Sequence, residues 1–301
     1  MKPLESTHSP ARRRLLLSMA ILPFASVAVS AGSMPDNAKA KVAARLAALE
    51  ASAHGRLGMA AFDTADGSRL DYRSDERFPF CSTFKLMLVA AILARAAGQI
   101  ALLDQRLHYR KSDLAHYSPI SEKHVADGMT VTELCAAAIQ YSDNTAANLL
   151  MKILGGPAAV TAFARTLGDI EFRLDRWEPE LNTAIPGDFR DTTTPAAMAH
   201  SLQRLTLGEV LMPLLRAQLL GWLRGNTTGN TRIRAGVPAS WQVGDKTGTG
   251  DYGSTNDVAI LMPPNRAPLF LALYFTQSDK NADSNSEVLA AATRIVVESF
   301  I

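Results

Sequence analysis

The sequence is poor in the residues that build metal sites and disulfide frameworks. Its 301 residues include only two cysteines, Cys81 and Cys135, and six scattered histidines. No C-x-x-C or H-E-x-x-H motif occurs, so no cluster of metal ligands is recognisable. Two cysteines allow one disulfide or none. We therefore expect no metal and no other cofactor.

The sequence also lacks a strong excess of one charge and lacks low-complexity segments. The formal net charge is only +2, and three of the arginines lie at positions 12–14, in a segment that we expect to be removed. Nucleic-acid binding usually requires a strongly basic surface, so we do not expect it here. With 47% hydrophobic residues the chain can bury a sizeable core. The expected partner is a small molecule.

The first 31 residues have the pattern of an export signal. Three arginines precede an apolar run from Leu15 to Leu22, and small residues follow up to Ala31. The run ends at Pro23 and is short for a membrane span. We expect residues 1–31 to be a cleaved signal peptide, exported by the Sec or the twin-arginine route. The mature protein is then periplasmic or secreted, without a membrane segment.

Hydrophobic periodicity predicts an α+β fold. A helix capped by Asp36 precedes two short strands, one with Leu57, Met59 and Ala61 on one face. Predicted helices then cover residues 78–94, 130–140, 144–155, 157–168, 194–208 and 212–226. Strands follow at residues 240–250, 255–262 and 268–277. A last helix starts with the capping-box pattern Ser284-x-x-Glu287.

Residues 169–193 interrupt the helical block without any regular period and contain two prolines. So long an irregular stretch inside a compact domain is usually functional or disordered. Its aromatic and apolar content argues against disorder. We therefore expect this loop to carry functional residues.

The segment GDKTGTGDYG, residues 244–253, fits two motifs. Gly248, Gly250 and Gly253 have the G-x-G-x-x-G spacing of a dinucleotide-binding turn. Such a turn needs a helix directly after its glycines, whereas the next residues here predict a strand. We therefore interpret the segment through its K-T-G motif, Lys246-Thr247-Gly248.

Two further motifs accompany K-T-G. Ser82 and Lys85 form S-x-x-K, which on a helix places the hydroxyl and the ammonium on one face. Lys85 is the only charged residue between Phe78 and Ala94 and needs a partner in such an apolar helix. Residues 142–144 form S-D-N, which alone could be a turn with Asn144 as N-cap. Each motif alone is weak, but the three in this order are far rarer.

Together with the segments CSTFK, YSDNTAANLL, RWEPELN and DKTGTGDYGSTND, the three motifs resemble the class A serine β-lactamases, in particular the Burkholderia-type penicillinase and extended-spectrum branch. The resemblance covers nearly the whole mature chain. It implies an antiparallel five-stranded sheet flanked by N- and C-terminal helices, with an inserted all-helical domain. The implied α/β domain comprises residues 32–80 and 226–301, and the helical domain comprises 81–225, including an active-site loop at 171–193.

The resemblance implies that a monomer hydrolyses the β-lactam ring of penicillins and cephalosporins through a serine acyl-enzyme, conferring resistance. The implied catalytic residues are Ser82 as nucleophile, Lys85 or Glu178 as acylation base, Glu178 as deacylation base, Ser142 as proton donor to the ring nitrogen, and Lys246. The implied substrate-binding residues are Asn144, Asn182, Thr247, Gly248, Thr249, Tyr117 and Arg232.

Finer expectations also rest on the resemblance. Arg176 and Asp191 should pair at the neck of the loop, and the peptide bond before Pro179 should be cis. No disulfide is expected, because the positions with which relatives pair Cys81 and Cys135 hold Gly250 and Val89 here. Two other functions share the acylation chemistry: a D-Ala-D-Ala transpeptidase or carboxypeptidase, which gives no reason for Glu178, and a β-lactam sensor that stays acylated.

Overall fold

The computed structural model describes residues 34–300, so the predicted signal peptide lies outside the described part. Five strands form one antiparallel sheet in the order β2-β1-β9-β8-β7. They are β1 (Gly55–Asp63), β2 (Arg69–Tyr72), β7 (Gln242–Gly250), β8 (Ser254–Met262) and β9 (Leu269–Gln277). β1 pairs with β9 along its whole length, so strands from the two ends of the chain are neighbours in the sheet. The expected α+β fold is confirmed.

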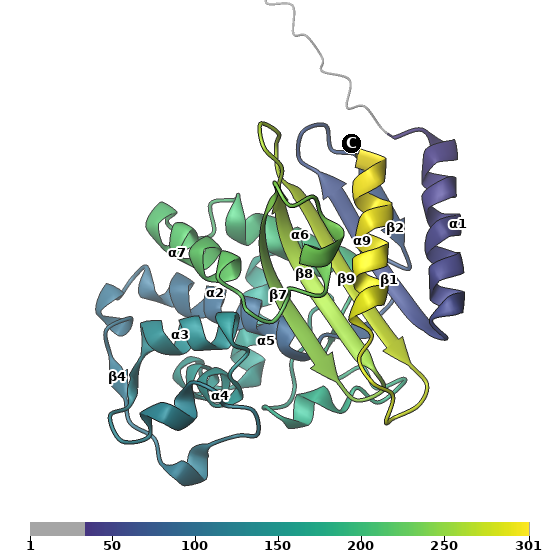
Figure 1. Ribbon diagram of the computed structural model, residues 1–301. Helices are drawn as coiled ribbons and strands as arrows, with labels where there is room; N and C mark the ends of the chain where they lie inside the picture. Colours follow the sequence, from purple (N-terminus) through teal and green to yellow (C-terminus); the bar gives the residue numbers. More distant parts are fainter. Residues whose placement is uncertain (1–33, 301) are drawn as a thin grey trace, which may run out of the picture. The chain divides into compact units, whose positions relative to one another are not determined.

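One face of the sheet is covered by the terminal helices. In Figure 1, α1 (Asp36–Ser52) and α9 (Ser286–Phe300) lie side by side on this face, and the short α8 (Ile233–Gly236) packs on α9. Leu57, Met59 and Ala61 of β1 point into this core together, as their alternation predicts. These helices anchor the sheet on the side away from the helical segment.

The other face carries the helical segment. The helix α6 (Pro195–Thr206) packs directly on β1, β8 and β9. The remaining helices are α2 (Phe84–Ala96), α3 (Val131–Gln140), α4 (Asn144–Leu154), α5 (Pro157–Thr166) and α7 (Pro213–Arg224). α2 is buried on almost every side, which agrees with its nearly uncharged sequence.

Short elements connect these units. Two-residue strands pair as β3 (Phe78–Pro79) with β6 (Thr192–Thr193) and as β4 (Arg106–Leu107) with β5 (Met129–Thr130). Single 3-10 turns occur at Cys81–Thr83, Ile100–Leu102, Lys111–Asp113, Ser121–His124 and Glu180–Thr183. The helix predicted from residue 78 therefore starts later, because Phe78 and Pro79 pair as a strand with the end of the loop.

The sheet and the helical segment share one hydrophobic core. Residues of α2, α3 and α4 pack in the same cluster as Phe62, Phe270 and Tyr274 from the sheet. The expected domain boundaries, 80/81 and 225/226, run through this core, and the division into two domains stays a prediction. Among residues 34–300 no single helix has the length and apolar composition of a membrane span; α4 and α5 meet that test only as a pair bent by 72°.

Candidate active site

The S-x-x-K motif lies at the entry to α2. Ser82 occupies the 3-10 turn before this helix, and Cys81 ahead of it has a φ of 47°, in the left-handed region. Lys85, one turn later, donates from Nζ to Ser82 Oγ at 2.8 Å, to the Ser142 carbonyl at 2.7 Å and to Asn144 Oδ1 at 2.6 Å. It also forms an ion pair with Glu178 Oε1 at 2.9 Å. The expected partner of the buried lysine is therefore a carboxylate.

Burial and charge act against each other on Lys85. Both Lys85 and Glu178 have fully buried side chains, and burial lowers the pKa of Lys85 from its usual value, while the neighbouring Glu178 carboxylate opposes the shift. The lysine thus lies within hydrogen-bond distance of the Ser82 hydroxyl, and its ammonium is more acidic than that of an exposed lysine.

The S-D-N turn is fixed by its aspartate. Asp143, not Asn144, is the N-cap of α4: its side chain accepts from the Ala146 N–H at 2.8 Å, and it also accepts from the N–H of Ser121 at 2.8 Å. Ser142 has a φ of 59°, which turns its carbonyl and hydroxyl toward Lys85. Asn144 is the first residue of the helix, so its amide can point at the site instead of capping.

The Asn144 amide has a fixed orientation. Its Oδ1 accepts from Lys85, and its Nδ2 donates to the His116 carbonyl at 2.7 Å. An amide nitrogen carries two N–H groups, so one donor is left over. That donor is suited to an acceptor on a bound ligand.

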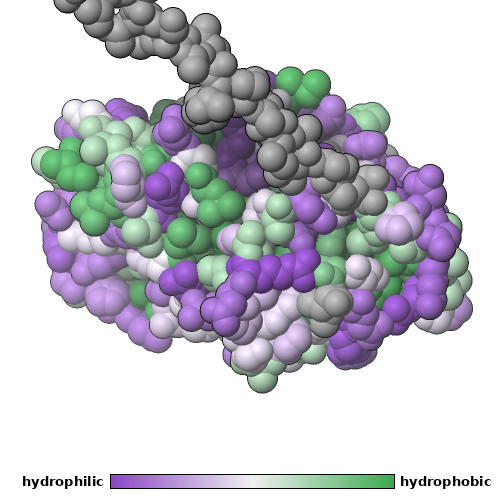
Figure 2. Space-filling model, turned by 90° about the horizontal axis from the view of Figure 1, so that it is seen from above, coloured by the Kyte–Doolittle hydropathy of each residue, from purple (hydrophilic) through white to green (hydrophobic). Residues whose placement is uncertain are grey.

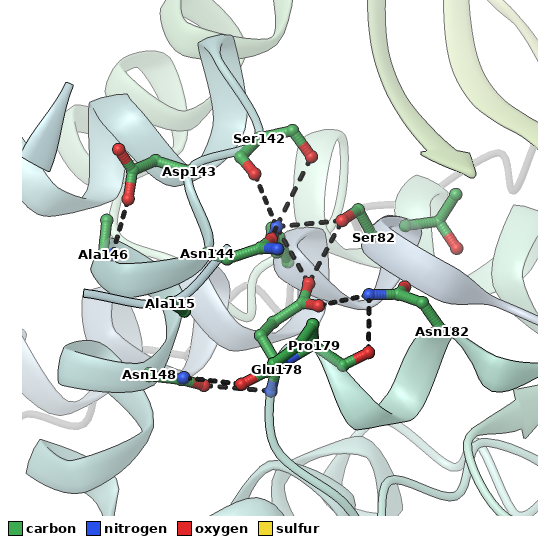
Figure 3. A network of polar contacts seen from close by, with 12 residues as sticks. Ser82, Ala115, Ser142, Asp143, Asn144, Ala146, Asn148, Glu178, Pro179 and Asn182 are labelled. Atoms are coloured by element: carbon green, nitrogen blue, oxygen red, sulfur yellow. Dashed lines mark hydrogen bonds and ion pairs between the residues drawn. The ribbon is translucent and has the colours of Figure 1, made fainter. Parts of the chain in front are cut away.

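The irregular loop brings Glu178 against the serine. Glu178 is 3% exposed, and its Oε1 accepts from Ser82 Oγ at 3.2 Å, while Oε2 accepts from Asn182 Nδ2. Figure 3 shows these three side chains pointing toward one another. Asn182 also donates to the Pro179 carbonyl at 3.1 Å, which leaves its buried Oδ1 without a partner. The bond between Glu178 and Pro179 is cis, as expected.

The sequence did not single out the residue that holds Glu178 in place. Asn148 of α4 donates to the Glu178 carbonyl at 2.9 Å and accepts from the Glu178 N–H at 3.0 Å (Figure 3). Both bonds are to backbone, so they fix the position of residue 178 whatever its side chain. Only the place of Asn148 inside YSDNTAANLL pointed to it.

The neck of the loop is closed by the expected ion pair. Arg176 Nε donates to Asp191 Oδ2 at 2.5 Å, and Asp191 Oδ1 accepts from the N–H groups of Asp175 and Arg176 at 2.8 and 3.0 Å. Asp191 is fully buried. One carboxylate therefore joins the two ends of the segment that carries Glu178.

The K-T-G strand forms the opposite wall. Lys246 of β7 is buried and donates to Ser142 Oγ at 3.2 Å and to the Thr247 carbonyl at 2.9 Å. Burial, together with the nearby Lys85 ammonium, lowers the pKa of Lys246 to about 7. Ser142 thus lies between two buried lysines.

Glycine allows β7 to approach the serine turn. A Cβ on Gly248 would lie 2.6 Å from the Phe80 carbonyl oxygen and 3.2 Å from the Ser82 nitrogen. A Cβ on Gly250 would lie 2.7 Å from Cys81 Sγ, so Cys81 faces Gly250 as expected. Cys81 and Cys135 are both buried and free. This close approach places β7 against the turn that carries Ser82, and Thr249 lines the same cavity as Ser82.

A cavity of about 820 Å³ joins the three motifs. Nine of the twelve predicted site residues line it: Ser82, Tyr117, Ser142, Asn144, Asn182, Arg232, Thr247, Gly248 and Thr249. The other three, Lys85, Glu178 and Lys246, are buried and contact the lining residues. Tyr117 is 53% exposed. A second cavity, of about 720 Å³, lies beside the loop tip and contains none of the predicted residues.

Arg232 is largely engaged by the protein itself. It is 7% exposed, donates from Nη1 to the carbonyls of Gly248 and Asn256, and donates from Nη2 to Thr249 Oγ1 at 2.6 Å. Only one Nη2 hydrogen remains for a ligand. Within the described part of the chain, no cluster of His, Cys, Asp and Glu could hold a metal ion.

A buried serine between a lysine and a glutamate, with backbone N–H groups at a helix start, defines a site for acyl transfer through a serine. The model of the β-lactamase enzyme family matches residues 41–300. Similar proteins include the β-lactamase CTX-M-97 of Escherichia coli, 56% identical over 96% of this chain and 98% of its own length. The β-lactamase OXY-1 of Klebsiella oxytoca is 55% identical over 96% and 98%.

Solved structures agree. A β-lactamase from Desulfarculus baarsii has a TM-score of 0.86 and 60% identity, covering 87% of this chain and 98% of its own. A class A β-lactamase representing the last common ancestor of Gram-negative bacteria has a TM-score of 0.84 and 60% identity, covering 86% and 99%. The chain belongs to the class A serine β-lactamases. It hydrolyses the β-lactam ring of penicillins and cephalosporins and thereby confers resistance.

Proposed function

We propose that Ser82 is the nucleophile that opens the lactam. Its hydroxyl is within reach of both candidate bases: Glu178 can take the proton as a carboxylate, and Lys85 can take it in its neutral form. The N–H groups of Ser82 and Thr249 stabilise the oxyanion, at roughly 3 kcal/mol per donor in comparable enzymes. Ser142, which contacts Lys246, passes a proton to the departing ring nitrogen. The observation that carries this proposal is the Lys85–Ser82–Glu178 contact.

Hydrolysis of the acyl-enzyme requires an activated water. We assign this step to Glu178 with Asn182, and the partner pattern of Asn182 supports the assignment. Its Nδ2 is taken by Glu178 and Pro179, and its buried Oδ1 has no donor among the residues that the structure describes. In the proposed step a water donates one hydrogen to Asn182 Oδ1 and the other to the Glu178 carboxylate, which itself contacts Ser82.

The substrate is held by the lining of the cavity and by the buried Lys246 that contacts this lining. Lys246, Thr247 and Thr249 bind its carboxylate, with the remaining N–H of Arg232 in support. Asn144 donates its remaining N–H to the side-chain amide of the substrate. Tyr117 forms the aromatic wall of the entrance.

We further propose that the mature enzyme is an exported monomer, free of the membrane. The signal-like pattern of residues 1–31 supports export. On the face drawn in Figure 2, hydrophobic residues are interspersed with hydrophilic ones instead of forming one continuous apolar surface. Such a face is typical of a protein that does not self-associate through it.

Glu178→Gln tests the hydrolytic assignment. Glutamine keeps the volume but cannot accept a proton, so deacylation should fall by about 10²–10⁴-fold, and far more than acylation. With a chromogenic cephalosporin we expect a burst of one equivalent per enzyme, then near-zero turnover and an acyl adduct on the peptide containing Ser82. Ser82→Ala should fold and show no adduct.

Glu180→Gln is the matched control, because Glu180 is an exposed carboxylate two residues away. It should hydrolyse the cephalosporin at the wild-type rate. Undiminished steady-state hydrolysis by Glu178→Gln would place the deacylation base elsewhere, and an adduct on a residue other than Ser82 would reject the nucleophile.

A further inference from the structure

A chain of hydrogen bonds runs from the buried interior of the sheet to the hydroxyl of Thr247. It starts at Asp245, fully buried on β7, whose Oδ1 accepts from Arg234 Nε at 2.7 Å. Asp245 Oδ2 accepts from Asn226 Nδ2 at 2.6 Å. Because the nitrogen of the Asn226 amide faces the carboxylate, its oxygen must face the other way.

The Asn226 oxygen is directed at Thr228. It accepts from the Thr228 backbone N–H at 3.1 Å and lies 2.8 Å from the Thr228 hydroxyl. The same hydroxyl lies 2.5 Å from Thr247 Oγ1, the hydroxyl of the K-T-G motif. Thr228 therefore connects the interior network to the substrate cavity, which both threonines line.

The loop that carries Thr228 is held tightly against this network. A Cβ on the next residue, Gly229, would lie 1.9 Å from Asp245 Oδ2. On the other side, the Thr227 N–H and hydroxyl donate to the Gln140 carbonyl at 3.0 and 2.7 Å. The Thr228 hydroxyl thus has a fixed position and only its hydrogen can turn.

That hydrogen has two acceptors. When it points to Asn226 Oδ1, Thr228 Oγ1 can accept, and the Thr247 O–H donates to it. When it points to Thr247 Oγ1, the Thr247 O–H is released toward the cavity. The second arrangement leaves Asn226 Oδ1 paired with the Thr228 N–H, and the Thr247 O–H is paired once a ligand in the cavity accepts from it.

We propose that Thr228 is a positioning residue for substrate recognition, whose hydroxyl turns toward Thr247 and so directs the Thr247 O–H at the carboxylate of the β-lactam. The proposal rests on the proposed role of Thr247 in binding that carboxylate. Without the Thr228 hydroxyl, Thr247 loses the donor that orients it, and its O–H has no fixed direction. Thr228 itself need not touch the substrate.

Thr228→Val removes the hydroxyl and keeps the shape, and Thr228→Ser keeps the hydroxyl. With benzylpenicillin we expect Thr228→Val to lower kcat/KM about tenfold, mainly through KM, as for a weakened hydrogen bond to a charged group. Thr228→Ser should stay within about twofold of wild type. With the methyl ester of benzylpenicillin, which has no carboxylate, Thr228→Val should change kcat/KM by less than about twofold. Thermal unfolding midpoints of all variants verify folding.

A double-mutant cycle with Thr247→Val separates this inference from the function on which it rests. Thr247→Val should itself lower kcat/KM on the free acid, and adding Thr228→Val should then have no further effect. If Thr247→Val lowers kcat/KM and Thr228→Val leaves it at the wild-type value, the positioning role of Thr228 alone is overturned. Wild-type activity of Thr247→Val overturns the carboxylate role of Thr247 as well. The inference is also overturned if Thr228→Val loses as much kcat/KM on the ester as on the free acid, since the effect is then structural. The same holds if Thr228→Ser loses as much kcat/KM as Thr228→Val.

Discussion

Two buried lysines lie on either side of one serine hydroxyl. Lys85 and Lys246 both contact Ser142. The positive charge on each lysine raises the free energy of protonating the other. Lys85 has the Glu178 carboxylate 2.9 Å away, whereas the acceptors of Lys246 within residues 34–300 are the Ser142 hydroxyl and a backbone carbonyl. The charge on Lys246 is therefore the less well compensated of the two.

This difference gives a pH dependence to substrate capture. The pKa of Lys246 is lowered to about 7, so its ammonium is present below that pH and is lost as the pH rises through it. Because we propose that the ammonium binds the substrate carboxylate, we expect kcat/KM to fall on the basic side of pH 7. Lys246→Arg keeps its charge throughout this range, so its profile should stay flat there. A basic limb that persists in Lys246→Arg would assign the titration to another group.

The residues that the sequence identified are those whose chemistry is local. Ser82 and Lys85 are three residues apart on one helix face, so their contact follows from helix geometry. Asn148 contacts Glu178, 30 positions away in the sequence, and Thr228 contacts Thr247, 19 positions away. No motif around Asn148 or Thr228 predicts these contacts. Glu178 was found only through the resemblance, because a glutamate before a proline in a loop is ordinarily a solvated acid.

At the level of elements, the N-cap residues of the terminal helices were predicted less accurately than the helix starts, most of which agree to within one residue. Asp36 lies in the first turn of α1, and Pro35 occupies the N-cap position without a side-chain hydrogen bond. The predicted capping box at Ser284 is wrong, since α9 begins at Ser286 and Asn285 Oδ1 accepts from the Val288 N–H at 3.3 Å. Ser284 and Asn285 are both polar and precede α9, so the sequence pattern alone does not decide which of them caps the helix.

The loop from residue 176 to residue 190 depends on one carboxylate at its neck. Asp191→Asn keeps an acceptor for the two N–H groups but removes the charge facing Arg176, which is itself only partly exposed. Breaking a buried pair costs about 3–5 kcal/mol, and the loop bears most of that cost locally. We expect faster amide hydrogen exchange across residues 176–190 and slower deacylation, because Glu178 and Asn182 lie in this segment.

Asp188→Asn is the matched control. Asp188 pairs with Arg190 within the same loop, and the pair does not join the two ends of the loop. Exchange and deacylation should then remain as in wild type. Equal protection in Asp191→Asn and wild type would show that contacts such as those of Asn148 hold the loop without the ion pair.

At the scale of the whole molecule, the sheet joins two hydrophobic cores. Successive residues of β1 alternate between them: Leu57, Met59 and Ala61 face the terminal helices, and Ala60 and Phe62 face the helical segment. β9 alternates in the same way. A strand cannot leave one core without exposing its residues in the other, so the two cores stabilise each other.

We therefore expect the described part of the chain to unfold in one cooperative step, even though its helical segment is inserted between the two parts of the sheet. Trp222 packs against the core shared with the helices, and Trp241 packs against the core under the terminal helices. Two variants that each keep one of these tryptophans, with phenylalanine at the other and at Trp177, report on each core separately. In urea both fluorescence transitions and the far-UV circular dichroism should share one midpoint. A Trp241 transition separated from that of Trp222 would show that the sheet and the helical segment unfold as independent domains.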